Sequence, residues 1–267
     1  MILIDFDMMA LSAEKVSKEG TTTQTSSSDS AAVVEGIFCT ATAGSPMQSC
    51  PKDLLVAGVG LQGDRYAQKE GTYSVVVPKE PGRQLTLISA DSVEQSLTAS
   101  GKTLTSIGSL RRNIVLRGSA MTALDLIQGI GKVLALGSTA RVFIHRNCVP
   151  CMYNEKRNQC PGMMEALWDV AGVNCEVLVG GEIAVGDVVR FLDPNEYPGH
   201  LPLPEDGHKP ASFYIRPSQR TLAMVQQGIE ERRQSKVTLT ELDPQGVARA
   251  EACFAAVGLS FFPPDKT

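Results

Sequence analysis

Between residues 33 and 193 the sequence is a succession of short β-branched and aromatic runs, separated by glycine and proline. The runs are VVEGIFCTATAG, LLVAGVG, TYSVVV, RQLTLI, NIVLRG, KVLALG, TARVFIHR, NCEVLVGG and GDVVRFL. Short runs bounded by turn residues are typical of strands. Helical patterns at 89–100, where Ser89 is the expected N-cap, at 121–128 and at 162–171 interrupt them without regular βαβ alternation. The pattern predicts a mainly β domain with a few helices (α+β), a largely antiparallel barrel or sandwich.

The segments that flank this region differ from it in composition. Residues 1–32 contain the small-polar stretch GTTTQTSSSDSAA, which cannot bury enough surface to order itself, so we expect a mobile leader there. After residue 193 come a Pro-rich connector and two amphipathic helical patterns, RPSQRTLAMVQQGIEERRQSK and DPQGVARAEACFAAVGL. The expected organisation is a leader at 1–32, a β-rich domain at 33–193, and a connector with a helical extension at 194–267.

Composition and charge exclude several classes of function. The net charge is −4 and no basic run occurs, so the clustered cations that bind nucleic acid are missing. No apolar run reaches the roughly 18 residues of a membrane span, and MILIDFDMMALSAEK lacks the basic start of a secretory signal. Seven cysteines, an odd number without such a signal, favour a reducing compartment, and we expect a cytoplasmic protein.

Three of the cysteines gather in HRNCVPCMYNEKRNQCPG, residues 145–162. A zinc knuckle would need a second closely spaced ligand pair beside Cys148 and Cys151, and a thioredoxin-like pair would begin a helix, whereas MYNEKRNQCPG is predicted to be a loop. Both alternatives are disfavoured but stay open. The charged neighbours predict an exposed loop that presents a reactive thiol. The cysteines in apolar runs are expected to be buried and inert, namely Cys39, Cys175 and Cys253.

From CVPC onward the sequence resembles the MOSC domain, a module found at the C-terminus of molybdenum cofactor sulfurases and as stand-alone proteins. The resemblance rests on CVPC at 148–151, the helical segment at 162–170, the GV strand at 172–173 and GEIAVGDVV at 181–189. Upstream, VEGIFCTATAGSPMQ, GLQGDRYA, GRQLTLISADSVE, RRNIVLRG and LIQGIGKVLALG follow the order of the family. The resemblance covers residues 33–193 and implies a MOSC-type β-barrel-like domain with a C-terminal helical extension beyond it.

This resemblance implies the molybdenum cofactor, a pterin with a phosphate and a dithiolene-bound Mo, together with a cysteine that carries a persulfide or ligates Mo. Cys151 matches the Pro-Cys position of the family and is the first candidate for either task. Cys148 is the candidate resolving thiol, because a thiol three residues away could attack a persulfide on Cys151. A thiolate suits both tasks, since it is nucleophilic and a soft ligand. His145 is a neighbour that could tune the thiol.

Polar residues upstream of the loop form the candidate cofactor site. Arg65 follows a Gly-rich turn, where its guanidinium can pair with a phosphate, and Asp64 is expected to orient it. The segment RRN at 111–113 precedes a strand, so alternation directs at least one of its side chains into the same pocket. The candidate cofactor-binding residues are Asp64, Arg65, Tyr66, Thr72, Tyr73, Arg112, Asn113 and Arg117.

Two functions compete on this basis. The first is a sulfur carrier or cofactor-handling protein, served by a PLP-dependent cysteine desulfurase as partner. The second is a Mo-dependent reductase of N-hydroxylated compounds that takes electrons from a partner. The sequence shows no PLP lysine, flavin or NAD fingerprint, or ferredoxin-type cysteine set of its own. It also departs from the family pattern, because Trp168 and Asp169 stand where many relatives carry an arginine before the GV strand.

Overall fold

The computed structural model describes residues 31–72, 82–199, 201 and 244–260. Residues 1–30 of the expected leader, the expected strand at 72–77 except Thr72, and the expected helix at 216–236 lie outside this part of the chain. Ala32 is buried, and its carbonyl accepts a 2.8 Å hydrogen bond from the Val189 amide. The packed body therefore includes this residue of the expected leader.

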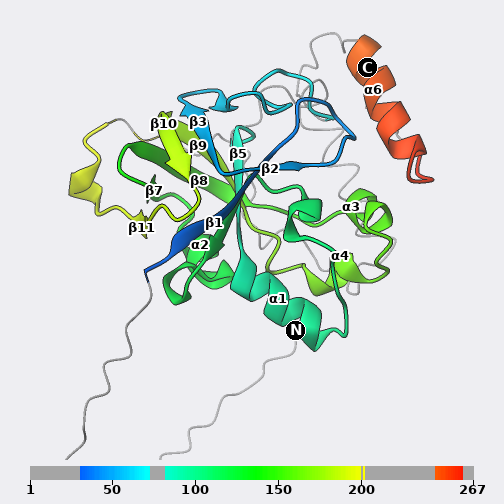
Figure 1. The fold of residues 1–267 in the computed structure, drawn as a ribbon, viewed down its shortest axis with the longest axis horizontal. Helices are drawn as coiled ribbons and strands as arrows, with labels where there is room; N and C mark the ends of the chain where they lie inside the picture. The colour runs from blue at the N-terminus through cyan, green and yellow to red at the C-terminus, as the bar shows by residue number, and fades with distance from the viewer. Residues whose placement is uncertain (1–30, 73–81, 200, 202–243, 261–267) are drawn as a thin grey trace, which may run out of the picture.

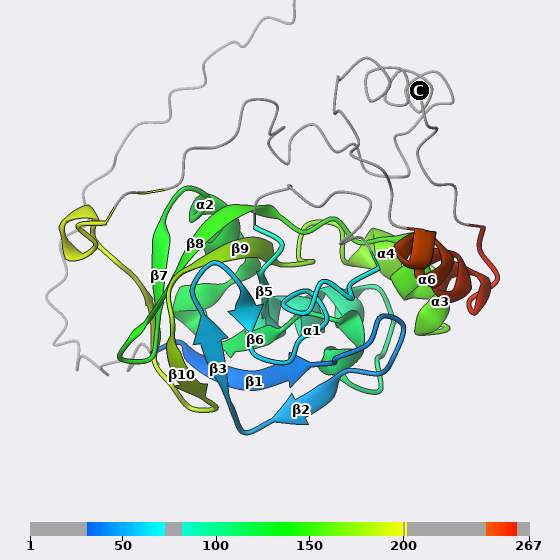
Figure 2. The ribbon, with the colours of Figure 1, turned by 90° about the horizontal axis from the view of Figure 1, so that it is seen from above.

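The described strands form two sheets (Figures 1 and 2). Eight strands make the larger sheet, in the order β11-β7-β8-β9-β5-β6-β1-β2, and three make the smaller one, in the order β10-β3-β4. Every pairing between these strands is antiparallel except that of β5 with β6. The strands are β1 (Val33–Cys39), β2 (Gln48–Cys50), β3 (Lys52–Val56), β4 (Gly60–Leu61), β5 (Leu85–Ser89), β6 (Ile114–Arg117), β7 (Val133–Leu136), β8 (Ala140–Asn147), β9 (Val173–Val179), β10 (Gly181–Ala184) and β11 (Val189–Phe191).

The larger sheet curls into a half-barrel around an apolar core (Figure 2). The edge at β11 returns toward β1, where an isolated antiparallel bridge joins Val33 to Val188. Because side chains alternate across a strand, one side of each strand fills the interior, and Ile37, Leu87 and Val142 there have no exposed surface. The mainly β, barrel-like fold that the sequence predicts is confirmed.

Helices form a second layer at β5 and β6. Helix α1 (Ala90–Ala99) connects these two parallel strands, and the predicted N-cap is confirmed because the Ser89 hydroxyl accepts a hydrogen bond from the Ser92 amide. Apolar side chains of α1, η1 and α4 pack on Ile88 and Val115 in a second core. The other short helices are η1 (Ile107–Leu110), η2 (Ser119–Met121), α2 (Ala123–Gln128), α4 (Met163–Ala166), shorter than the predicted 162–171, and η3 (Pro194–Glu196).

Helix α3 (Met152–Arg157) occupies the segment that the sequence analysis predicts to be a loop, so that prediction is wrong. Cys151 is the N-cap, with extended backbone, and its carbonyl accepts hydrogen bonds from the amides of Asn154 and Glu155. The buried Asn154 side chain donates to the Leu110 carbonyl at 3.1 Å. A helix this short is marginal alone, so a tertiary contact absent from the local pattern stabilises it.

The C-terminal helix α6 (Pro244–Ala255) lies beside α3 in both views (Figures 1 and 2). The ring of Phe254 is 5.2 Å from the ring of Tyr153 on α3, and Arg249 forms a 3.0 Å ion pair with Glu70. The predicted second amphipathic helix of the extension is therefore confirmed, and it packs on the β-rich body. None of the described helices is long and apolar enough to cross a membrane.

Gly172 should be the least replaceable glycine near the cysteine segment. Its φ is +91°, a Cβ there would lie 2.1 Å from the Leu87 carbonyl oxygen, and its own carbonyl accepts a 2.7 Å hydrogen bond from the Cys148 amide. Gly172→Ala should lower the free energy of unfolding by at least about 2 kcal/mol, because backbone strain and a backbone overlap act together. Denaturant titration measures this loss.

Gly131→Ala is the matched control, because φ is +87° and nothing lies within 4 Å of the added Cβ. An alanine at position 131 introduces the backbone strain without an overlap. We therefore expect the free energy of unfolding to fall by about 1 kcal/mol. Equal losses in the two variants would contradict the role of the close approach at Gly172.

Candidate functional site

Cys151 lies between the end of β8 and the start of α3, on the face of the sheet that the helices cover. Pro150 and Cys151 line a small recess together with Ile88, Leu110, Arg112, Asn154, Met163, Leu167 and Ala171. The recess has a volume of about 10 Å³, the space of about one water molecule. Cys151 is half-buried. The structure therefore places Cys151 at the edge of a space about the size of one water molecule.

Arg112 forms part of the wall of this recess, so the structure brings this predicted residue together with Cys151. Its Nε donates to the Ala171 carbonyl at 2.7 Å and its Nη1 donates to the Leu110 carbonyl at 3.3 Å. These two hydrogen bonds join the end of η1 to the segment before β9. Arg112 thus fixes the shape of the recess through hydrogen bonds from its side chain to two backbone carbonyls.

The predicted exposure of the 145–162 segment is wrong for Cys148. This residue is only 5% exposed, and its amide is bound to the Gly172 carbonyl. Cys175 is fully buried, as the sequence predicts, and burial raises the pKa of its thiol well above the usual value, with the nearby Cys148 sulfur adding to the effect. Cys148 therefore packs in the interior beside a second inert thiol, and a resolving role for it would require the segment to open.

Asp64 is the centre of a buried polar network. Its carboxylate accepts hydrogen bonds from Nη1 of Arg65 at 3.2 Å, the Tyr66 amide at 3.0 Å, Nδ2 of Asn113 at 3.3 Å and the Thr40 amide at 3.4 Å. Only 1% of Asp64 is exposed. Such a carboxylate is stable because every neighbour donates to it. The predicted role for Asp64, orienting Arg65, agrees with this geometry, and Asn113 serves the same network.

Three arginines lie close together beside this network. Arg111 donates to the Ser45 carbonyl at 2.5 Å. Burial, and to a smaller extent the positive charges of Arg65 and Arg157, lower the pKa of its guanidinium to about 10. The Arg111 guanidinium is therefore still protonated at neutral pH. We call Arg65, Arg111 and Arg157 the arginine cluster.

Tyr153 has a buried polar atom next to the arginine cluster. Its side chain lies close enough to Arg111 to affect the pKa of that guanidinium, and the residue is 8% exposed. Among the described residues, the Tyr153 hydroxyl has no hydrogen-bond partner. A buried unpaired hydroxyl is costly, and an anionic oxygen would satisfy it. The combination of three cations with an unpaired hydroxyl is typical of a site for an anion.

Sequence reasoning names Arg157 only as a charged neighbour in the predicted loop. The signal that would have found it is its spacing of four residues from Tyr153, which places both side chains on one face of a helix. That signal depends on recognising α3. Arg111 belongs to the RRN segment from which the sequence analysis selects Arg112 and Asn113, and the structure assigns the three residues to different contacts.

Arg117, a predicted cofactor-binding residue, lies among acidic side chains at the other end of β6. It forms ion pairs with Glu35, Asp91 and Glu94, the last two at 2.7 Å. Hydrogen bonds to Glu94 and Glu35 raise the pKa of its guanidinium. Arg117 ends β6, about 13 Å along the strand from Asn113. Its charge is therefore neutralised by carboxylates at the other end of the strand.

The remaining candidate residues are Tyr66, Thr72, Tyr73 and His145. Tyr66 lies beneath the Arg65 guanidinium, whose central carbon is 4.9 Å from the ring centroid. Thr72 is buried, and Tyr73 lies outside the described residues. His145 is buried and pairs with Glu176 across β8 and β9 at 2.9 Å, so it has a structural partner.

Comparisons with known proteins found one family match and several similar solved structures. Residues 75–190 match the family model of the MOSC domain. Similar solved structures include the YuaD protein from Bacillus subtilis, 18% identical, which covers 59% of this chain and 93% of its own length with a TM-score of 0.49. Others are YiiM from Geobacillus stearothermophilus (14% identical, 61% and 75% covered, TM-score 0.44) and YiiM from Escherichia coli (12%, 77% and 94%, 0.43). No curated protein matches the chain.

This family match makes residues 75–190, less than half of the chain, similar to a MOSC domain. The MOSC family is associated with binding of the molybdenum cofactor.

The two cysteines of the CVPC segment should differ in reactivity. We expect iodoacetamide to label Cys151 in the native, reduced chain faster than Cys148 by roughly tenfold or more, because Cys148 reacts only after local opening. Peptide mass spectrometry over time measures each rate, with buried Cys175 as the internal unreactive control. Equal rates at Cys148 and Cys151 would contradict the burial described above.

Proposed function

We propose that this chain binds the molybdenum cofactor beside α3 and carries sulfur for it on Cys151. The observation that supports this most is the shared position of two features on one short helix. Cys151 caps the start of α3, whereas Tyr153 and Arg157 lie along it, and Arg157 is about 9 Å further on. The proposed reactive sulfur and the proposed anion site therefore lie on the same short helix.

The residues present suit the phosphate of a pterin cofactor. The arginine cluster offers planar guanidinium donors, which pair well with phosphate oxygens, and the unpaired Tyr153 hydroxyl offers one more donor. When bound, the cofactor supplies a thiophilic metal with which a cysteine sulfur can interact. Asp64 orients Arg65 toward this role while neutralising part of its charge.

The sulfur step needs one nucleophile from this chain. The Cys151 thiolate would attack the outer sulfur of a persulfide on a donor such as a PLP-dependent cysteine desulfurase. A new S–S bond forms at Cys151, the S–S bond of the donor breaks, and its electron pair leaves on the donor thiolate. The step involves no net oxidation. The recess at Cys151 has the volume to hold one added sulfur atom, and a reducing, cytoplasmic setting would keep the thiol available.

The alternative function is a Mo-dependent reductase of N-hydroxylated compounds, in which Cys151 would ligate Mo and a partner protein would supply electrons.

Analysis of the purified full chain distinguishes the two functions. After exposure to a persulfide donor, we expect cyanide-labile sulfur at one equivalent per chain, lost in Cys151→Ser and kept in Cys160→Ser, because only Cys151 faces the recess. Unchanged labile sulfur in Cys151→Ser would reject the assignment. Stoichiometric Mo and pterin on the untreated protein, without labile sulfur, would support the reductase.

Tyr153→Phe tests the anion site separately from folding. Because the hydroxyl has no partner among the described residues, its removal should leave the free energy of unfolding unchanged or slightly higher. Affinity for a pterin phosphate, measured by pterin fluorescence, should fall by roughly tenfold, the value of one lost hydrogen bond to a charged group. Arg117→Gln is the control, since this residue is outside the site, and it should keep full affinity. Unaltered affinity in Tyr153→Phe would contradict the proposed site.

A further inference from the structure

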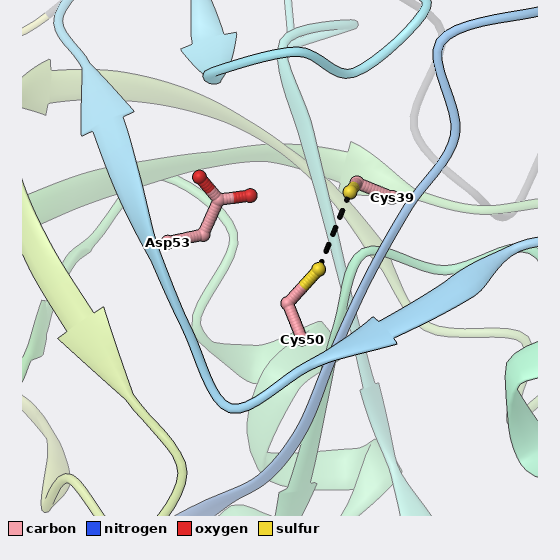
Figure 3. A group of neighbouring side chains, drawn as sticks. All are labelled: Cys39, Cys50 and Asp53. Atoms are coloured by element: carbon pink, nitrogen blue, oxygen red, sulfur yellow. Dashed lines mark hydrogen bonds between the residues drawn. The ribbon is translucent and has the colours of Figure 1, made fainter.

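A second group of sulfur ligands lies away from Cys151, at the turn that joins β1, β2 and β3 (Figure 3). The Sγ atoms of Cys39 and Cys50 are 3.6 Å apart, and a carboxylate oxygen of Asp53 lies within 4.8 Å of both. All three residues are half-buried. We propose that Cys39, Cys50 and Asp53 bind a thiophilic divalent cation of the Zn²⁺ type.

Strand register brings these three residues together. In the β1–β2 hairpin Ile37 pairs with Cys50, and Cys39 pairs with Gln48, so the two cysteines are diagonal neighbours on one face of the sheet. Pro51 is the single residue between β2 and β3, and this sharp corner returns Asp53 to the same place. Cys39 is half-buried, so the expected full burial of this residue is wrong. The apolar run that contains it ends at the rim of the core.

The distance between the two sulfur atoms is compatible with two ligands of one tetrahedral metal. Zn–S bonds of about 2.3 Å at tetrahedral angles separate two sulfur ligands by roughly 3.8 Å, close to the 3.6 Å observed. Asp53 accepts a 2.7 Å hydrogen bond from the Leu54 amide through Oδ1, which fixes the carboxylate while its other oxygen stays available. Three protein ligands with water as the fourth is a common coordination for Zn²⁺.

This site is distinct from that of Cys151. Cys39 and Cys50 pack against the core inside the half-barrel, whereas the recess at Cys151 is lined by residues of the helical layer. The two groups therefore lie on opposite faces of the sheet. Among the described residues, the cysteines of the 145–162 segment take part in no such group of three metal-ligating residues.

The charges around the site favour a cation. Burial, the neighbouring Cys50 thiol and the carboxylates of Asp53 and Asp64 together raise the pKa of the Cys39 thiol to about 12. These two carboxylates therefore place negative charge beside the sulfur atoms. By connecting three strands, the cation would also stabilise the native chain.

Titration of the full chain tests the proposal, after chelator treatment and under reducing conditions. Co²⁺ should bind at one equivalent with a thiolate-to-metal charge-transfer band, and Zn²⁺ should displace it and raise Tm. Cys39→Ser and Cys50→Ser should each remove the charge-transfer band or reduce its intensity by half, and Asp53→Asn should lower the affinity by an order of magnitude or more.

Cys151→Ser and Cys160→Ser are the matched controls, and both should bind Co²⁺ like the original chain. Loss of binding in Cys151→Ser with retention in Cys39→Ser would move the metal to the other segment and overturn the proposal. Absence of any charge-transfer band, or formation of a Cys39–Cys50 disulfide without metal binding under the same conditions, would overturn it as well.

Discussion

The buried carboxylate of Asp64 connects the parts of this domain that carry its candidate chemistry. It accepts hydrogen bonds from the end of β1 at Thr40, from the turn at Arg65 and Tyr66, and from Asn113 just before β6. A buried charge of this kind is tolerated only while its donors remain in place, and loss of one partner leaves an uncompensated charge. The turn with Arg65, the segment after β1 and the segment before β6 are therefore all joined by hydrogen bonds to a single side chain.

The Asp64 network lies between the proposed cation site and the proposed cofactor site. Thr40 directly follows Cys39 of the proposed cation site, and Arg65 belongs to the arginine cluster of the proposed cofactor site. The sheet keeps the two sulfur groups on opposite faces, one against the interior of the half-barrel and one in the helical layer. A cation at β1–β3 would therefore stabilise the turn that holds Arg65, without competing for Cys151.

The sequence predicts those features that depend on local pattern. The strands, the Ser89 cap and the C-terminal helix follow from alternation, capping chemistry and 3.6-residue periodicity. Features set by long-range contact could not be predicted. Helix α3 depends on a hydrogen bond from Asn154 to Leu110, and Arg117 pairs with acidic residues 23 to 82 positions away. Cys148 is buried through its contact with Gly172. The charged residues near Cys148 in the sequence give no indication of this contact.

The central claim is that Cys151 is the sulfur-bearing residue of this chain. The most direct measurement is the intact mass of the reduced full chain after exposure to a persulfide donor, followed by peptide mapping of the added mass. The account predicts the gain of one sulfur atom, located on the peptide that contains Cys151 and removable by a reductant. Added sulfur located on another cysteine, or a chain whose mass does not change, would contradict it.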